Sequence, residues 1–164
     1  MNTRIINEII NGTVIDHIEA GQSCQIYKLI GLVDSDLTVT IGIRLSSSKM
    51  GQKDVIKVEG KFLTPKEVET IALFAPRSTL SIIKDQKVVE KFKPPLAQEI
   101  SGVFDCHNAK CISHSESIPT RFRIERRFKS IQLECAFCQG KWNLHDTSFI
   151  HDHLQRSSKP VGVL

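Results

Sequence analysis

The feature that most constrains this chain is a set of four cysteines in its last third. They form two short pairs, Cys106-x4-Cys111 and Cys135-x2-Cys138, separated by 23 residues. Four thiolates at about 2.3 Å suit a tetrahedral Zn²⁺ ion and leave no coordination position open to a substrate. We therefore predict one structural zinc ion per chain, held by a small module after residue 100, and expect the function to lie elsewhere.

The cysteines could instead form two disulfides or a redox pair. Disulfides need an oxidising compartment, and residues 1–11 show neither the apolar core nor the cleavage site of a signal peptide. A redox CxxC pair usually opens a helix in a thioredoxin-like βαβ unit, a pattern that is missing around Cys135. Structural zinc is thus the favoured interpretation. The fifth cysteine, Cys24, lies in an apolar segment and is predicted to be a buried thiol.

The size and charge of the chain exclude some classes of protein. Its 164 residues suit one domain or two small ones. No apolar run approaches the ~20 residues that cross a bilayer, so we expect a cytoplasmic protein with no membrane partner. The formal net charge of +4 is mild, and it permits nucleic-acid binding without requiring it.

Two adjacent prolines, Pro94 and Pro95, mark the best domain boundary because proline cannot continue a sheet ladder. We expect a first domain over 1–96, a zinc-binding domain over 97–145 and a flexible tail over 146–164. The tail contains the pair His151-x-His153. A solvated tail accounts for that pair better than a metal site does, because no partner ligands are evident.

The first domain alternates between strand and helix periodicity. The first predicted strand places Val14, Asp16 and Ile18 on one face. Strands are expected at 13–18, 37–45, 54–59, 79–83 and 88–92, and helices over 26–33 and 64–75.

The second predicted helix has clear start and stop signals. Thr64 and Glu67 form a capping box, Pro65 suits the first helical position and Pro76 ends the helix. The resulting order β-α-β-β-α-β-β indicates an α+β fold. We predict an antiparallel sheet with two helices on one face (ferredoxin-like), plus a small C-terminal all-β zinc-binding domain.

The residues alone do not reveal a catalytic site in the first domain. It contains no GxGxxG motif, no P-loop and no evident nucleophile–base–acid set. Lysines could meet the phosphates of an anionic ligand as point charges, and a carboxylate could take ribose hydroxyls or a base amino group. Solvated strand faces are the commoner case, and the residues alone favour that interpretation. The charged residues in question are Asp16, His17, Lys53, Lys57 and Lys91.

The second domain carries a basic run, Arg121–Lys129, interleaved with Phe122 and Phe128. Alternation predicts a strand with arginines on one face. Basic strands of this kind in zinc ribbons often bind nucleic acid or proteins. The third interpretation is a strand face that only contacts solvent. These three interpretations remain open at this point.

Several motifs together resemble the regulatory chain of aspartate carbamoyltransferase. They are GTVIDHI at 12–18, TIGI at 40–43, MGQKDVIK at 50–57, LFAP at 73–76, CHNAKCISH at 106–114 and the second cysteine pair. The resemblance covers about residues 9–144. It implies a non-catalytic regulatory subunit in pyrimidine biosynthesis, with ATP as activator and CTP, supported by UTP, as inhibitor. It also implies regulatory-chain homodimers that join catalytic trimers, with no nucleic acid as partner.

The resemblance also implies which residues bind. Asp16 and Lys57 would contact ribose and base, while His17, Lys53 and Lys91 would contact the triphosphate. The walls around the base would be Ile9, Val14, Ile83 and Val88. Contacts with the catalytic chain would come from Asn108, Glu116 and Arg127.

The chain departs from the best-known members at four further positions of these two regions. Ser81 and Gln86 stand where those members carry Asn and Tyr near the base, so we expect weaker discrimination between ATP and CTP. Lys110 and Lys129 replace Asn residues at the catalytic-chain contact. The alternative function is a nucleic-acid-binding zinc-ribbon protein that uses the strand Arg121–Lys129.

Overall fold

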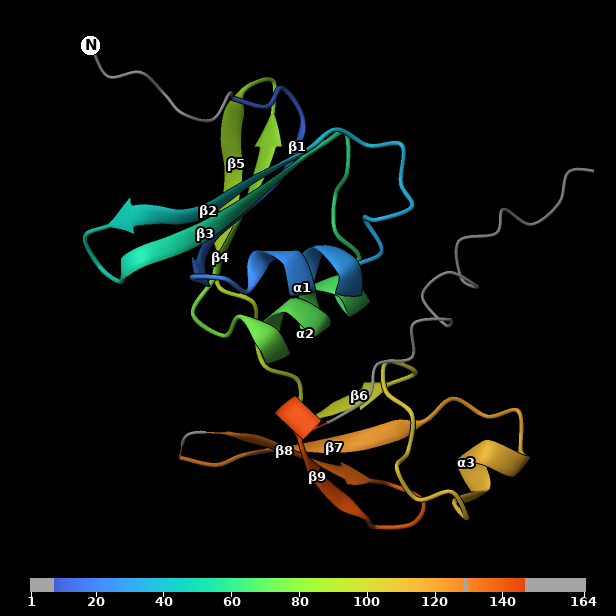
Figure 1. Ribbon diagram of the computed structural model, residues 1–164. Coiled ribbons are helices and arrows are strands. Elements are labelled where there is room, and N and C mark those ends of the chain that lie inside the picture. The colour runs from blue at the N-terminus through green and yellow to red at the C-terminus, as the bar shows by residue number, and fades with distance from the viewer. Residues whose placement is uncertain (1–7, 129, 147–164) are drawn as a thin grey trace, which may run out of the picture. The chain divides into compact units, whose positions relative to one another are not determined.

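The computed structural model describes residues 8–128 and 130–146. The chain divides into two compact units, with the boundary between Leu96 and Ala97. The boundary directly follows Pro94 and Pro95. Each unit has its own sheet (Figure 1).

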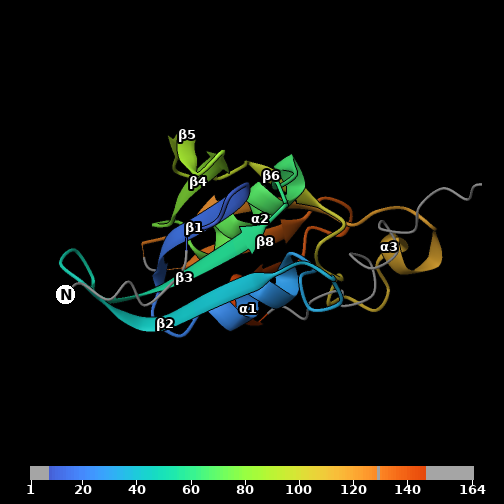
Figure 2. The same cartoon turned by 90° about the horizontal axis from the view of Figure 1, so that it is seen from above.

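The first unit is a five-stranded antiparallel sheet in the order β2-β3-β1-β4-β5. Helices α1 and α2 lie side by side on one face of it (Figures 1 and 2). This arrangement confirms the predicted split βαβ fold, extended by β5. The elements are β1 (Gly12–Glu19), α1 (Ser23–Leu29), β2 (Val39–Ser47), β3 (Gly51–Glu59), α2 (Pro65–Phe74), β4 (Thr79–Lys84) and β5 (Lys87–Phe92).

The core of this unit lies between the sheet and the helices. Ile15 of β1, Ile56 of β3 and Leu80 of β4 are fully buried, and they meet Ile26 of α1 and Ile71 of α2. Burying an aliphatic side chain of this size contributes about 1.5–3 kcal/mol. The side chains buried between the sheet and the helices therefore stabilise the unit.

Helix α2 begins as predicted. The backbone N–H of Glu67 donates to Thr64 Oγ1 at 3.3 Å, and the Thr64 N–H donates to Glu67 Oε2 at 2.7 Å. This reciprocal capping box and the first-turn Pro65 account for the sharp start. The signal was readable because it is local.

A β-bulge in β1 corrects the predicted face of Ile18. Ile15 pairs with Ile56, but Ile18 pairs with Asp54, so two residues of β1 oppose one of β3. His17 adopts a left-handed φ of 57° in this bulge. Ile18 therefore turns into the core, whereas Val14 and Asp16 remain on the opposite face.

Helix α1 is shorter than predicted and corrects two further expectations. It ends at Leu29, and Val33 lies beyond it at 50% exposure. The prediction that Cys24 is buried is wrong. Cys24 is exposed, because the inward stripe of α1 is Ser23, Ile26 and Leu29.

The second unit is built on a four-stranded antiparallel sheet in the order β6-β7-β8-β9. Phe104 and Phe122 are buried at its centre and pack edge to face with ring centroids 6.2 Å apart. Its elements are β6 (Glu99–Ser101), α3 (Ile112–Ser115), β7 (Arg121–Arg126), β8 (Ile131–Cys135), β9 (Lys141–Asn143) and the 3₁₀ turn η1 (Leu144–Asp146).

Strand β7 shows the predicted alternation, since Phe122 is buried while Arg121 and Arg123 are exposed. Lys129 and the His151-x-His153 pair lie outside the described residues. Across the described part of the chain, every helix is too short or too polar to cross a membrane.

Candidate metal centre and ligand-binding face

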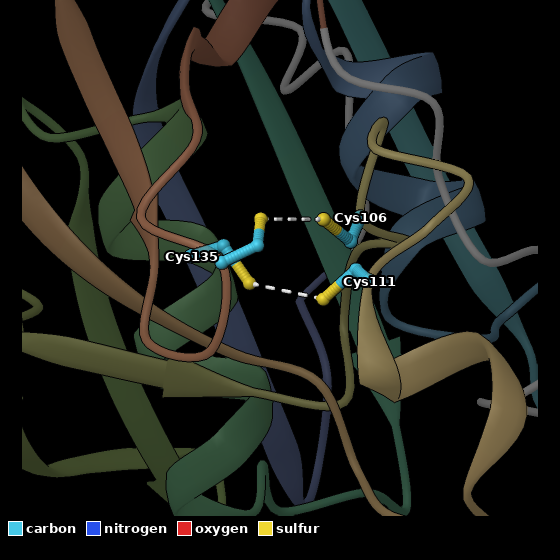
Figure 3. Close-up of side chains that lie close together, drawn as sticks. Cys106, Cys111 and Cys135 are labelled. Atoms are coloured by element: carbon cyan, nitrogen blue, oxygen red, sulfur yellow. Dashed lines mark hydrogen bonds between the residues drawn. The ribbon is translucent and has the colours of Figure 1, made fainter.

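The four cysteines of the second unit converge on one point. Their sulfur atoms all lie within 4.8 Å of one another, with Cys106 and Cys138 at 3.5 Å and Cys111 and Cys135 at 3.8 Å. Figure 3 shows Cys106 and Cys111 facing Cys135. Four sulfurs placed tetrahedrally at ~2.3 Å from a metal would be about 3.8 Å apart. Two disulfides would need two separate pairs, whereas a single group of four suits a metal ion.

The local structure around the cysteines holds them in place. Cys106 and Cys111 flank a short loop before α3, and Cys135 ends β8 just before a tight turn. In that turn Gln139 has a left-handed φ of 60° and its N–H donates to the Cys135 carbonyl at 2.9 Å. Gly140 also suits this turn, because a Cβ there would displace the Trp142 ring.

Side chains around the cluster fix the ligands and affect their protonation. The Ser113 hydroxyl donates to Cys111 Sγ at 3.3 Å, and His114 Nε2 is 2.7 Å from the Cys106 carbonyl. Burial raises the pKa of Cys106 and Cys135. Burial also raises the pKa of Cys111, but hydrogen bonds from Ser113, Cys106 and Cys135 together outweigh it and bring that pKa to about 7. Metal binding must displace the thiol protons, so affinity falls with falling pH.

The second feature is the face of the first sheet that carries no helix. Directly paired residues on neighbouring antiparallel strands point to the same face. The register therefore sets one row of side chains across all five strands. This central row consists of Thr40, Lys57, Val14, Ser81 and Lys91.

Two further rows flank the central row on this open face. On one side, Ile83 pairs with both Gly12 and Val88. On the other side, Asp16 pairs with Thr79, and Lys53 lies beside it. The open face therefore runs from an apolar end, through the central row, to a charged end.

The structure brings the predicted nucleotide contacts together. Val14, Lys57 and Lys91 lie in the central row, and Ile83 and Val88 form the apolar end. The charged end consists of Asp16, His17 and Lys53.

Ile9 lies just before β1 and is half-buried. The next residue, Ile10, is tied to the β4–β5 turn, because its carbonyl accepts from the Gln86 N–H at 2.9 Å. The predicted wall residue is therefore connected to the turn that carries Gln86.

Asp16 organises the charged end. Its Oδ1 accepts from Lys53 Nζ at 2.8 Å and from the His17 backbone N–H at 2.6 Å. Burial alone would raise the pKa of Asp16, but the Lys53 hydrogen bond, the His17 N–H and the nearby positive charge bring it below its usual value. His17 Nδ1 is buried, lies 3.5 Å from Asp16 Oδ2, and has no hydrogen-bond partner among the described residues.

Two carboxylates that support this face were not singled out from the sequence. Asp54 is fully buried, and its oxygens accept from Gly21, Ser23 and Arg44. These hydrogen bonds overcome the effect of burial and lower the pKa of Asp54. Glu59 accepts from the backbone N–H of Ile10 at 3.2 Å and so holds the segment next to the apolar end. The available signal for Asp54 was an acidic residue directly before the apolar pair Val55 and Ile56.

The predicted catalytic-chain contacts all lie in the second unit. Asn108 and Glu116 are exposed on either side of Cys111, and the Asn108 carbonyl accepts from the Cys111 N–H at 2.9 Å. Arg127 follows β7 and donates to Glu125 at 2.8 Å. Its neighbour Phe128 is 97% exposed. No hydrogen bond or ion pair of the described residues joins these three to one another.

Comparison with known proteins gives matches over both units. The family described as aspartate carbamoyltransferase regulatory chain, allosteric domain, matches residues 4–95, and the metal binding domain of that chain matches residues 98–147. A relative from Tolumonas auensis, named aspartate carbamoyltransferase regulatory chain, is 45% identical over 134 residues, covering 82% of this chain and 87% of its own. A relative of the same name from Thermococcus kodakarensis is 41% identical over 139 residues, or 84% and 91% of the two chains.

Proposed function

Because the chain belongs to the family of aspartate carbamoyltransferase regulatory chains, we propose that it binds ATP, CTP and UTP on its open face and passes their effect to catalytic trimers. The protein is a regulatory rather than a catalytic chain. We assign residues 1–96 to nucleotide binding and 97–145 to attachment. On the basis of the pyrimidine pathway we also propose a cytoplasmic location.

The observation that carries the nucleotide proposal is the arrangement of the open face. Ile83 and Val88 offer apolar contacts to a base at one end, and Val14 adds one in the central row. Lys57 and Lys91 stand in the central row, and Lys53 with Asp16 at the other end. Lysines bind phosphates as point charges, and a carboxylate accepts hydrogen bonds from ribose hydroxyls or an amino group. With its base at the apolar end, a nucleotide would extend its ribose and phosphates over the central row toward Lys53.

The departures at Ser81 and Gln86 bear on selectivity. Ser81 lies in the central row between Val14 and Lys91. Gln86 occupies the β4–β5 turn with a left-handed φ of 62°. A hydroxyl reaches less far than an amide, and Gln offers no aromatic surface to a base. We propose that both triphosphates bind while discrimination between ATP and CTP is weak.

We propose that the metal held by the second unit is Zn²⁺, one per chain. Tetrahedral all-thiolate sites favour zinc or iron–sulfur chemistry, and a closed set of four suits structural zinc. The residues that would hold it are Cys106, Cys111, Cys135 and Cys138. The metal would then fold the surface that carries Asn108, Glu116 and Arg127, through which regulatory dimers join two catalytic trimers.

Regulation would follow from linkage. A nucleotide can shift an equilibrium between two quaternary states only by its differential affinity for them, typically about 1–3 kcal/mol. The effect must pass from the open face through the segment containing Pro94 and Pro95 to the zinc-bearing unit.

A pair of lysines on β5 tests the nucleotide proposal. Lys91 lies on the open face, whereas Lys87 pairs with Lys84 and points to the opposite face. Lys91→Ala should weaken CTP binding on the order of tenfold, the loss of one charged hydrogen bond. Lys87→Ala is the matched control and should change affinity less than twofold. Calorimetric titration of the full chain measures both, and equal affinities for the two variants would contradict the proposed face.

The structure gives the nucleic-acid alternative less support. On the β7–β8 surface, Arg123 lies 3.6 Å from Glu134 and Arg127 lies 2.8 Å from Glu125. The negative charges of these carboxylates would repel a phosphate backbone. Nucleic-acid binding that weakens steeply with salt, together with failure to associate with the catalytic chain, would favour the alternative.

A further inference from the structure

We infer that an open pocket beyond the charged end receives the terminal phosphate of a bound nucleoside triphosphate, with Arg77 as its cation and Glu19 as a competing anion. The inference rests on the proposed nucleotide binding and extends it to residues that the resemblance does not include. It makes Arg77 the residue that distinguishes a triphosphate from a monophosphate.

The pocket has a volume of about 530 Å³. It lies where three segments of the first unit meet: the end of β1, the β2–β3 hairpin and the turn between α2 and β4. Its lining residues are Glu19, Ala20, Met50, Gly51, Gln52 and Arg77.

The register places this pocket next to the charged end of the open face. Glu19 pairs directly with Lys53, so both side chains point to the open face. Lys53 in turn contacts Asp16 at 2.8 Å. Arg77 lies in the turn before β4, two residues ahead of Thr79, the partner of Asp16. The pocket therefore adjoins the Lys53–Asp16 pair through Glu19.

The two charged residues of the pocket differ from the Lys53–Asp16 pair in how firmly they are held. Arg77 Nη1 and Glu19 Oε1 are 4.0 Å apart, at the limit of an ion pair, and their side chains are 60% and 56% exposed. Exposed pairs of this kind contribute little to stability. Lys53 is only 19% exposed and is closely engaged by Asp16. Arg77 can therefore leave Glu19 and bind another anion at a small cost in free energy.

The chemistry of Arg77 suits a phosphate. Its planar guanidinium donates two parallel hydrogen bonds to phosphate oxygens, which a lysine cannot do. A phosphate in the pocket would also meet the carboxylate of Glu19, which repels it and competes for Arg77. Removing the carboxylate should therefore strengthen triphosphate binding, and removing the guanidinium should weaken it.

The experiment is calorimetric titration of the full chain with CTP and CMP, repeated with ATP and AMP. The variants are Arg77→Gln, Glu19→Gln and the control Lys49→Gln. Lys49 is exposed on the same β2–β3 hairpin but does not line the pocket, so its substitution reproduces the change in net charge alone.

We expect Arg77→Gln to weaken triphosphate binding about tenfold and Glu19→Gln to strengthen it severalfold, with monophosphate binding and the control changed less than twofold. Equal effects of Arg77→Gln on tri- and monophosphates, or an equal effect of Lys49→Gln, would overturn the inference. A wild-type chain that binds none of the four nucleotides would overturn the proposed function itself. Should Arg77→Gln fail to fold, an unchanged triphosphate affinity in Glu19→Gln would still overturn the inference.

Discussion

Replacing Asp54 by asparagine should destabilise the first unit more than any change of similar size on its surface. The carboxylate is fully buried and links three separate segments. Oδ2 accepts from the Gly21 N–H at 2.9 Å, the Ser23 N–H at 3.1 Å and the Ser23 hydroxyl at 2.6 Å. Oδ1 accepts from the Arg44 N–H at 2.8 Å. Asparagine keeps the shape but has only one acceptor oxygen.

The expected cost follows from these four contacts. Hydrogen bonds to a charged group contribute about 1.5–3 kcal/mol each and neutral ones about 0.5–1.5, so three bonds at Oδ2 would lose roughly 3 kcal/mol together. The amide nitrogen would then face the Arg44 N–H and leave a buried donor unpaired, at roughly 1 kcal/mol or more. Because such contributions are not additive, we expect about 3–5 kcal/mol for Asp54→Asn.

The cost should also depend on pH in one direction. The pKa of Asp54 is lowered in the folded chain by the Ser23, Arg44 and Gly21 hydrogen bonds, which exceed the opposing effect of burial. The stability that it contributes is therefore present above the unfolded-state pKa of about 3.9 and is lost as the pH falls through the folded value. The difference between wild type and Asp54→Asn should be constant from about pH 5 to 7 and shrink below pH 4.

Urea unfolding of the full chain followed by far-UV circular dichroism measures this difference. The chain has one tryptophan, Trp142 in the second unit, so its fluorescence reports that unit separately. Asp36→Asn, at an exposed position of the same unit as Asp54, is the control and should cost less than about 0.5 kcal/mol. A cost below about 1 kcal/mol for Asp54→Asn at pH 7, no more than a single neutral hydrogen bond contributes, would refute the reasoning.

Two further changes test the fold and the metal centre. Gly12→Ala should destabilise the chain by on the order of 2–4 kcal/mol in urea unfolding, because φ is 146° and a Cβ would clash with the Val58 carbonyl oxygen. The control Gly31→Ala should cost less, since Gly31 also has a positive φ but open space around it. Equal costs for the two variants would contradict the argument from the close approach to Val58. Cys111→Ser should lower the bound zinc below one ion per chain, since the closed site needs all four thiolates. Light scattering of the complex should then show free catalytic trimers. A complex that survives complete zinc loss would contradict the structural role of the metal.

Local signals made part of the fold readable from the sequence. The capping box of Thr64 and Glu67 depends only on residues three apart, and α2 begins where it predicts. The β1 bulge could not be predicted, because it exists only in the pairing of β1 with β3. The prediction for Cys24 failed because the apolar segment around it does not say which side of a short helix faces the sheet.

The two candidate sites differ in the same way. The metal centre was readable because two close cysteine pairs suffice to define a ligand set. On the open face, the residue types suggested an anion site only weakly, and the resemblance supplied the positions. The central row joins residues from 14 to 91, and only the strand register reveals that they are neighbours. The pocket at Arg77 depends on three segments and had no sequence signal.

Alternation along the strands has a consequence for how regulatory chains diverge. On β4, Leu80 is buried on the helix-covered face, while its neighbour Ser81 points to the open face. If the open face binds effectors as proposed, a single substitution there can alter which effector is preferred while the packed interior keeps its shape. Related chains could acquire different metabolic responses by a few point changes on one architecture, without first passing through poorly folded intermediates.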